Sequence, residues 1–194
     1  MKPACPLLRL IREHRVRKFW KMSRNMMICM LNGHRMKKVA MEAAIGASMS
    51  GVRSFAAMKM VGVNVAADPL LTFAYLGING GFAFVSADDP GMHSSQNEQD
   101  NRNYAKFAKI AMFEPSDSQE CIDMTKEAYK VSETYGVPVM IRMTTRVCHS
   151  KSLVEEQDRQ EVPPVLYQKQ REKWMPYQPF PRNAAMSSKN GKKN

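Results

Sequence analysis

The stretch G-F-A-F-V-S-A-D-D-P-G-M-H-S-S-Q-N-E-Q-D, residues 81–100, joins an apolar run to a long polar one. Residues 81–87 are apolar without alternation, which is typical of a parallel strand that is buried on both faces of its sheet. Residues 88–100 have no apolar periodicity, and their Pro90-Gly91 pair favours a turn. Long loops that follow such strands carry function more often than short connections do. We therefore expect a parallel sheet with a functional loop at the carboxyl end of one strand.

Helix and strand signals alternate on both sides of this stretch. We expect helices at residues 39–50, 68–78, 102–110 and 116–135, and further strands at residues 53–59, 111–113 and 138–144. Asp68 is expected to cap the second helix, and Ser116 with Gln119 is expected to form a capping box on the fourth. Gly46, inside the first helix, is expected to allow another backbone to approach closely. Alternating βα units with short apolar strands indicate an α/β fold, a three-layer αβα sandwich with a mostly parallel sheet.

The net charge of +11 is unevenly distributed. Residues 1–38 contain eleven Lys/Arg and one acidic residue, whereas residues 39–153 contain ten Lys/Arg and twelve acidic residues. A nucleic-acid footprint belongs on the folded body, which here is slightly acidic, so we expect no nucleic-acid partner. Because no run of 18 apolar residues occurs and residues 1–38 lack a signal-peptide pattern, we expect no membrane segment either.

The cysteines are scattered and form no C-x-x-C pair: Cys5, Cys29, Cys121 and Cys148. Neither a zinc ion nor an iron–sulfur cluster therefore has its usual ligand spacing, and we expect no metal site in this chain. Free thiols are typical of a reducing compartment, which favours a cytoplasmic location.

Two motifs carry a resemblance to one family. They are M-K-M-V-G-V-N-V-A-A-D-P, residues 58–69, and the polar loop of residues 88–100. Together they resemble the alpha subunit of indolepyruvate:ferredoxin oxidoreductase, one of the thiamine-diphosphate-dependent 2-oxoacid:ferredoxin oxidoreductases. The resemblance implies a truncated pyrimidine-binding domain at residues 38–153, and the Gln-, Pro- and Lys-rich residues 154–194 are then expected to be a linker or disordered tail.

The resemblance also implies what the parent enzyme does. It would oxidatively decarboxylate aryl 2-oxo acids such as indolepyruvate to acyl-CoA, with thiamine diphosphate and Mg as cofactors. Electrons would pass through [4Fe-4S] clusters to ferredoxin, and a beta subunit would be the partner. The magnesium-binding and cluster-binding parts are expected to lie outside this sequence.

The same resemblance, with the polar character of the loop, gives six candidate cofactor-binding residues: Gly62, Asn64, His93, Ser95, Gln96 and Asn97. The loop residues offer donors and acceptors to the substrate, the cofactor or a partner domain. The alternatives are a strand-to-helix turn for Gly62 and Asn64, and a solvated surface loop for the four residues of the long loop. Arg142 and Arg146 end the last expected strand, where Arg142 is expected to pair with an acidic neighbour and Arg146 to face the cofactor side.

Lys37 stands where the family has an essential carboxylate. Activation of thiamine diphosphate needs a glutamate that hydrogen-bonds the aminopyrimidine ring, and the resemblance identifies it as the Glu of N-E-K-V-A. Here Lys37 precedes K-V-A, and a cation cannot accept that bond. We therefore expect no catalytic residue and no activity from this chain alone. The alternative is a non-catalytic α/β binding module of the same fold.

Residues 1–37 fit an out-of-frame translation. When the possible codons for residues 10–21 are read from each third base, they permit Y-P-G-T-P-S-T-E-V-L-E. The same shift over residues 31–37 permits E-W-S-S-N-E, and its last codon is forced by Met36-Lys37. Both strings resemble the family, and the family pattern resumes in frame at Lys38. One extra base in the adenine run that encodes Lys37 and Lys38 explains the change, so residues 1–37 are expected to form no domain of their own.

Overall fold

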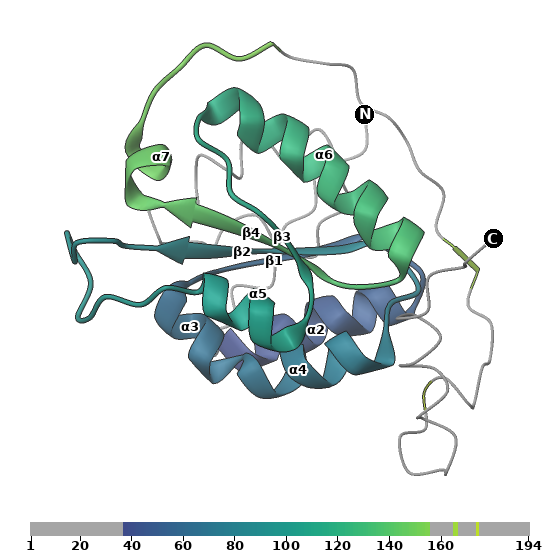
Figure 1. Cartoon of the computed structure of the whole chain (residues 1–194). Helices are drawn as coiled ribbons and strands as arrows, with labels where there is room; N and C mark the ends of the chain where they lie inside the picture. The colour runs from purple at the N-terminus through teal and green to yellow at the C-terminus, as the bar shows by residue number, and fades with distance from the viewer. Residues whose placement is uncertain (1–36, 156–164, 167–173, 175–194) are drawn as a thin grey trace, which may run out of the picture.

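The computed structural model describes residues 37–155, 165, 166 and 174. Its elements are α2 (Lys37–Met49), β1 (Ser54–Lys59), α3 (Met60–Val65), α4 (Ala67–Leu76), β2 (Phe82–Asp88), α5 (Arg102–Ala108), β3 (Ala111–Phe113), α6 (Ser118–Tyr135), β4 (Val139–Thr144) and α7 (Thr145–His149). Helices α2, α3, α4 and α5 cover one face of the sheet, and α6 and α7 lie on the other (Figure 1). The expected three-layer αβα sandwich is confirmed. The predictions for residues 1–36 and for most of residues 154–194 lie outside the described residues.

The described strands form one parallel sheet in the order β1-β2-β4-β3. In the register, Phe84 of β2 lies between Ala56 of β1 and Met140 of β4. All four expected strands are present, within one residue of their predicted ends. Because every described pair is parallel, all carboxyl ends lie at the same edge of the sheet.

Strand β2 separates two apolar clusters, and its side chains alternate between them. Phe82 and Phe84 pack on the side of α2 and α4, where the Phe82 ring meets Phe73 edge to face with the ring centres 5.2 Å apart. Ala83 and Val85 pack on the side of α6. All four strand residues are buried. Burial on both faces explains why the sequence of β2 is apolar throughout and shows no alternation.

The N-cap of helix α6 lies one residue later than the predicted cap Ser116, and the helix itself begins at Ser118. Asp117 is the N-cap, and its side chain accepts a hydrogen bond of 2.8 Å from the backbone N–H of Glu120. The Glu120 carboxylate in turn accepts from the backbone N–H and the hydroxyl of Ser116. The predicted capping box of Ser116 and Gln119 is therefore wrong by one position, because Asp117 is the N-cap and Glu120, not Gln119, stands at the third helical position. The predicted end of the helix at Gly136, with φ 67°, is confirmed.

The connection from β1 into α4 also differs from the prediction. Residues 60–65 form a short helix, α3, and Ala66 joins it directly to α4, which begins at Ala67. Asp68 therefore lies inside the first turn of α4 and is not its cap. Its carboxylate instead accepts a hydrogen bond of 2.8 Å from the Lys38 ammonium of α2. An acidic side chain remains favourable there because of the helix dipole.

Two backbone segments approach closely at Gly80, and not at Gly46 as the sequence suggested. The Gly80 N–H donates to the carbonyl of Ser48 at 2.7 Å, and the Ser48 hydroxyl donates to the carbonyl of Gly80 at 2.5 Å. A Cβ at position 80 would lie 2.6 Å from the carbonyl oxygen of Val52. A Cβ on Gly46 would have no atom outside its own helix within 4 Å. The glycine that the fold requires is therefore the one in the turn before β2.

Cys121 is expected to react far more slowly than Cys148 with iodoacetamide. Burial raises the pKa of the Cys121 thiol to about 12, and the neighbouring Cys148 and Asp117 raise the pKa further. Since the thiolate is the nucleophile, raising the pKa keeps Cys121 protonated and slow at pH 8, by about 100-fold or more relative to an ordinary thiol. Alkylation can be followed by peptide mass spectrometry, with the chain in urea as the control in which both thiols react alike. Equal rates in the folded chain would show that Cys121 is accessible.

Candidate functional site

The candidate site lies at the edge where β1, β2 and β4 end. The loop of residues 89–101 leaves the carboxyl end of β2 and projects beyond the strand tips (Figure 1). In parallel α/β sheets, ligands bind outside the carboxyl ends of the strands. The structure therefore places the polar loop where the sequence analysis expected a functional one.

A buried ion pair lies beneath this loop. Arg142 of β4 is 5% exposed, and Asp88 at the end of β2 is 1% exposed. The Arg142 Nε donates to Asp88 Oδ2 at 2.7 Å, and its Nη1 donates to the carboxylate of Glu114. The expected acidic partner of Arg142 is thus confirmed. The carboxylates of Asp88 and Glu114 neutralise this guanidinium within the fold, so little of its charge remains to attract a ligand.

Asn101 binds the far end of the loop to strand β2. Its side chain is fully buried, and its backbone N–H donates to Asp88 Oδ2 at 3.0 Å. The Asn101 amide donates to the Ser86 hydroxyl at 2.7 Å, and that hydroxyl donates to Asp88 Oδ1 at 2.8 Å. Buried polar groups that are all hydrogen-bonded specify one geometry, so the loop returns to a fixed point.

Asp89 holds the near end of the loop. This residue is fully buried, and its Oδ2 accepts from the Ser94 N–H at 2.8 Å and from the Ser95 hydroxyl at 2.6 Å. Its Oδ1 accepts from the hydroxyl of Thr145 at 2.5 Å. Gly91, with φ 78°, makes the reversal that brings residues 94 and 95 back to Asp89. One carboxylate therefore fixes the conformation of the loop tip.

Asn64 connects α3 to the loop. Its amide and that of Gln99 exchange two hydrogen bonds, of 2.8 and 2.7 Å, and the Tyr104 hydroxyl donates to Asn64 Oδ1 at 2.7 Å. The Asn64 side chain is exposed at the same edge of the sheet. The structure thus gives Asn64 a role in placing the loop. A role in binding a cofactor stays a prediction.

Lys37 and Gly62 lie against one another at this edge. Lys37 is the first residue of α2, and Gly62 is buried in α3 directly after β1. A Cβ added to Gly62 would lie 3.0 Å from the Lys37 Cγ and 3.1 Å from the Met58 Cβ. The glycine therefore leaves space for the side chain at position 37. The position that the resemblance assigns to a carboxylate therefore lies beside Gly62, and a lysine occupies it.

The remaining predicted site residues are on the loop tip. His93, Gln96 and Asn97 are exposed, and Ser95 is half-buried through its bond to Asp89. The six candidates therefore lie on two neighbouring segments, α3 and the loop, and the Asn64–Gln99 bonds join these segments. Asp89 and Asn101, which anchor the loop, are not among the residues predicted from the sequence. An acidic residue immediately after a buried strand is the available signal for such an anchor.

The described residues contain no cluster of three or more His, Cys, Asp or Glu side chains that would hold a metal ion. Within that same part of the chain, no helix is long and apolar enough to cross a membrane.

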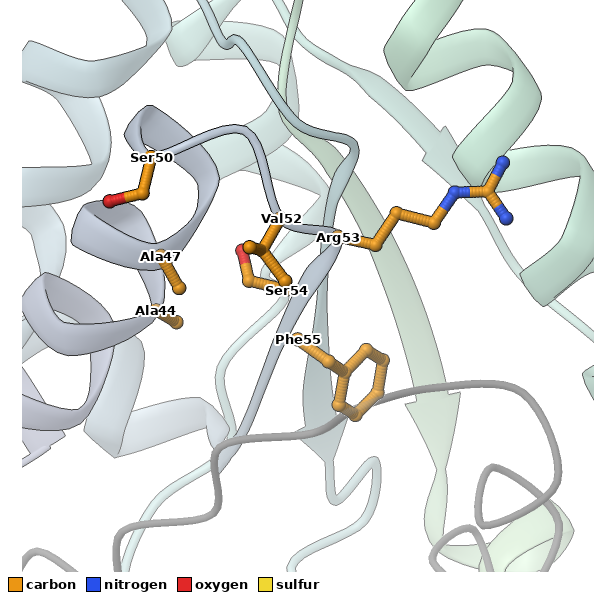
Figure 2. A pocket seen from close by; sticks show the side chains of 7 residues that line it. All are labelled: Ala44, Ala47, Ser50, Val52, Arg53, Ser54 and Phe55. Atoms are coloured by element: carbon orange, nitrogen blue, oxygen red, sulfur yellow. The ribbon is translucent and has the colours of Figure 1, made fainter. Parts of the chain in front are cut away.

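A pocket lies at the opposite end of β1 from the candidate site. It is an apolar pocket of about 220 Å³ between α2 and the start of β1 (Figure 2). Its lining residues are Ala44, Ala47, Ser50, Val52, Arg53, Ser54 and Phe55. The Arg53 guanidinium turns away from the pocket and pairs with Glu133 of α6. Neither the predicted site residues nor their hydrogen-bond partners line this pocket, so it does not belong to the candidate site.

The fold, a parallel α/β sandwich, also occurs in a protein of known structure. The structure is similar to that of a 2-oxoglutarate:ferredoxin oxidoreductase from Magnetococcus marinus, with a TM-score of 0.50 and 19% identity over 59% of this chain and 21% of that one. At that identity the likeness shows the fold alone. The shared fold is the α/β sandwich, which covers 21% of that oxidoreductase.

The family of this chain is shown by a match to its sequence. Residues 38–191 match the model of the pyruvate flavodoxin/ferredoxin oxidoreductase, thiamine diphosphate-binding family, and the chain belongs to this family. The match begins one residue after Lys37. The resemblance that the two sequence motifs carry is thereby confirmed.

The curated relatives that the chain matches are subunits of indolepyruvate oxidoreductases. An indolepyruvate oxidoreductase subunit IorA from Archaeoglobus fulgidus is 56% identical over 119 residues, which are 61% of this chain and 19% of the relative. The IorA of Methanothermobacter thermautotrophicus is 48% identical over 141 residues, 72% of this chain and 23% of the relative. The IorA of Pyrococcus horikoshii is 55% identical, over 59% of this chain and 18% of the relative. The chain thus spans about a fifth of the length of these relatives.

Proposed function

We propose that this chain is part of the alpha subunit of an indolepyruvate:ferredoxin oxidoreductase. The complete enzyme breaks the bond between the 2-oxo carbon and the carboxylate of an aryl 2-oxo acid, releases carbon dioxide, transfers the acyl group to CoA and passes the electron pair to ferredoxin. Three relatives named as indolepyruvate oxidoreductase subunits, at 48–56% identity, support this assignment.

The cofactors and partners of the proposed enzyme are those of the complete protein. Thiamine diphosphate, bound with Mg, would stabilise the negative charge that is left on the 2-oxo carbon when the carboxylate leaves as carbon dioxide. The [4Fe-4S] clusters that carry electrons to ferredoxin, and the beta subunit, belong to other parts of the assembly. We place the complete enzyme in the cytoplasm, which fits the scattered cysteines.

One observation carries the assignment of the site, the position of residue 37. The first residue of α2 lies against Gly62 at the carboxyl edge of the sheet, where Gly62 leaves space beside it. Gly62, Asn64 and the loop are proposed to hold the pyrimidine ring, and the Lys37 ammonium supplies only donors where the ring needs an acceptor. The residues present therefore do not fit activation of thiamine diphosphate, and the chain as written is proposed to be inactive.

We further propose that residues 1–37 are translated out of frame. The family match that begins at residue 38 supports this proposal, since it starts where the frame is expected to resume. Sequencing the genomic DNA around codons 37 and 38 tests it directly. An adenine run one base shorter than the present codons require supports the proposal. A verified run that encodes Lys37-Lys38, with the same amino-terminal segment in related strains, refutes it.

Lys37→Glu is expected to strengthen thiamine diphosphate binding relative to the present chain. A carboxylate that accepts a hydrogen bond from the cofactor ring contributes about 1.5–3 kcal/mol, which is about 10–150-fold in affinity. Titration calorimetry with thiamine diphosphate and Mg measures this on the 194-residue chain, with Lys37→Gln as the neutral control. Glutamate should bind most tightly and glutamine less tightly.

The alternative is a non-catalytic α/β binding module. Lys37 favours this alternative, because the hydrogen-bond acceptor for the cofactor ring is absent while the fold is kept. Under this alternative, Lys37→Glu binds thiamine diphosphate no better than Lys37→Gln does. Equal and weak affinities of the two variants would therefore replace the first proposal with the second.

A further inference from the structure

The carboxyl edge of the sheet carries several acidic side chains, and an anionic substrate has to be held beside them. Asp88, Asp89, Asp100 and Glu114 all lie at this edge or on its loop. The carboxylate of a 2-oxo acid would be repelled there unless a cation faces it. This inference rests on the proposed function, because it concerns how such an acid is held.

Most cations near this edge are already paired. The Arg142 guanidinium is held between Asp88 and Glu114. Arg102 of α5 makes a bidentate pair with Asp100, and Lys38 of α2 pairs with Asp68. A cation that is neutralised in this way has little attraction left for a ligand.

Lys59 differs from these residues. It is the last residue of β1, it is half-buried, and its Nζ donates to the backbone carbonyl of Ser94 at 3.2 Å. It forms no ion pair with any carboxylate of the described residues. An ammonium has three donors, and a single carbonyl uses one of them. Asp89 fixes Ser94, so the Lys59 ammonium is held at the loop tip.

Arg146 is a further cation near this edge. It is exposed on α7, beyond the end of β4, and makes no ion pair within the described part of the chain. Helix α7 lies on the face of the sheet that carries α6, whereas α3 and the Asn64 contact lie on the other face (Figure 1). Lys59 directly contacts the loop that carries His93, Ser95, Gln96 and Asn97, and no such contact joins the described Arg146 side chain to that loop.

We propose that Lys59 binds the carboxylate of the 2-oxo acid at the tip of the 89–101 loop. The two donors of its ammonium that Ser94 does not use face the ligand, and the loop side chains supply further donors beside them. The Ser94 carbonyl keeps the long lysine side chain in place, which lowers the entropic cost of binding.

Phenylpyruvate binding to the 194-residue chain tests this proposal by calorimetry. A charge-assisted hydrogen bond is worth about 1.5–3 kcal/mol, so Lys59→Met is expected to weaken binding by about 10-fold or more. Lys59→Arg should retain most of the affinity, and Arg146→Met should bind like the unchanged chain. Phenylacetone, which has the aryl group and the ketone but no carboxylate, should bind equally weakly to all four proteins.

Three results would overturn the proposal: no binding of phenylpyruvate to the unchanged chain, an affinity that Lys59→Met leaves unaltered, or a loss seen with Arg146→Met in its place. Thiamine diphosphate binding by Lys37→Glu is scored separately. If that binding is observed while Lys59→Met has no effect, the carboxylate site is wrong and the proposed function remains. If Lys59-dependent phenylpyruvate binding occurs without thiamine diphosphate binding, the anion site stands and the proposed function falls.

Discussion

Replacing Arg142 with methionine is expected to lower the free energy of unfolding by about 3–5 kcal/mol. The substitution keeps most of the side-chain volume but leaves the Asp88 carboxylate, 1% exposed, without its cation. Asp88 also accepts hydrogen bonds from the Ser86 hydroxyl and from the backbone N–H of Asn101. A shift of the unpaired carboxylate therefore also disturbs the anchor at the end of the loop. Urea denaturation followed by circular dichroism measures the change.

Two variants control this experiment. Arg102→Met removes an arginine from an exposed pair with Asp100, and exposed pairs contribute little to stability. Asp88→Asn combined with Arg142→Met removes both charges, so the double variant should be more stable than the sum of the two single losses predicts. An Arg142→Met variant no less stable than Arg102→Met would mean that the buried pair does not support the fold.

The strands could be predicted from the sequence because their signals are local. The apolar run that became β2 needs both faces covered, and the structure buries Phe82 and Phe84 on one face and Ala83 and Val85 on the other. The parallel sheet follows from the same feature, since only helices on both sides can provide that cover. The short helices were missed, because neither α3 nor α7 is long enough to show a period.

The candidate site could be predicted only in part. The loop was visible as a long polar segment after a strand, but its anchors join residues far apart in the sequence. Arg142 and Asp88 are 54 positions apart, and Asn64 and Gln99 are 35 apart. No local pattern predicts such pairs. Composition did indicate that the loop is polar, and only the fold shows that Asp88, Asp89 and Asn101 face inward while His93, Gln96 and Asn97 remain exposed.

Gly80→Ala is expected to destabilise the domain by about 3 kcal/mol or to prevent folding, because the added methyl has no space. Its Cβ would lie 2.6 Å from both the Gly51 carbonyl carbon and the Val52 carbonyl oxygen, and backbone cannot rotate away as a side chain does. Two hydrogen bonds to Ser48 hold the turn against α2, so a shift that relieves the clash breaks them. Gly46→Ala is the matched control: it adds the same methyl group in α2 at a place with open space, and should raise stability by about 1 kcal/mol through helix propensity. Thermal unfolding of both variants measures the difference. If the two substitutions change the melting temperature in the same direction and by similar amounts, the close packing at Gly80 does not contribute to the fold.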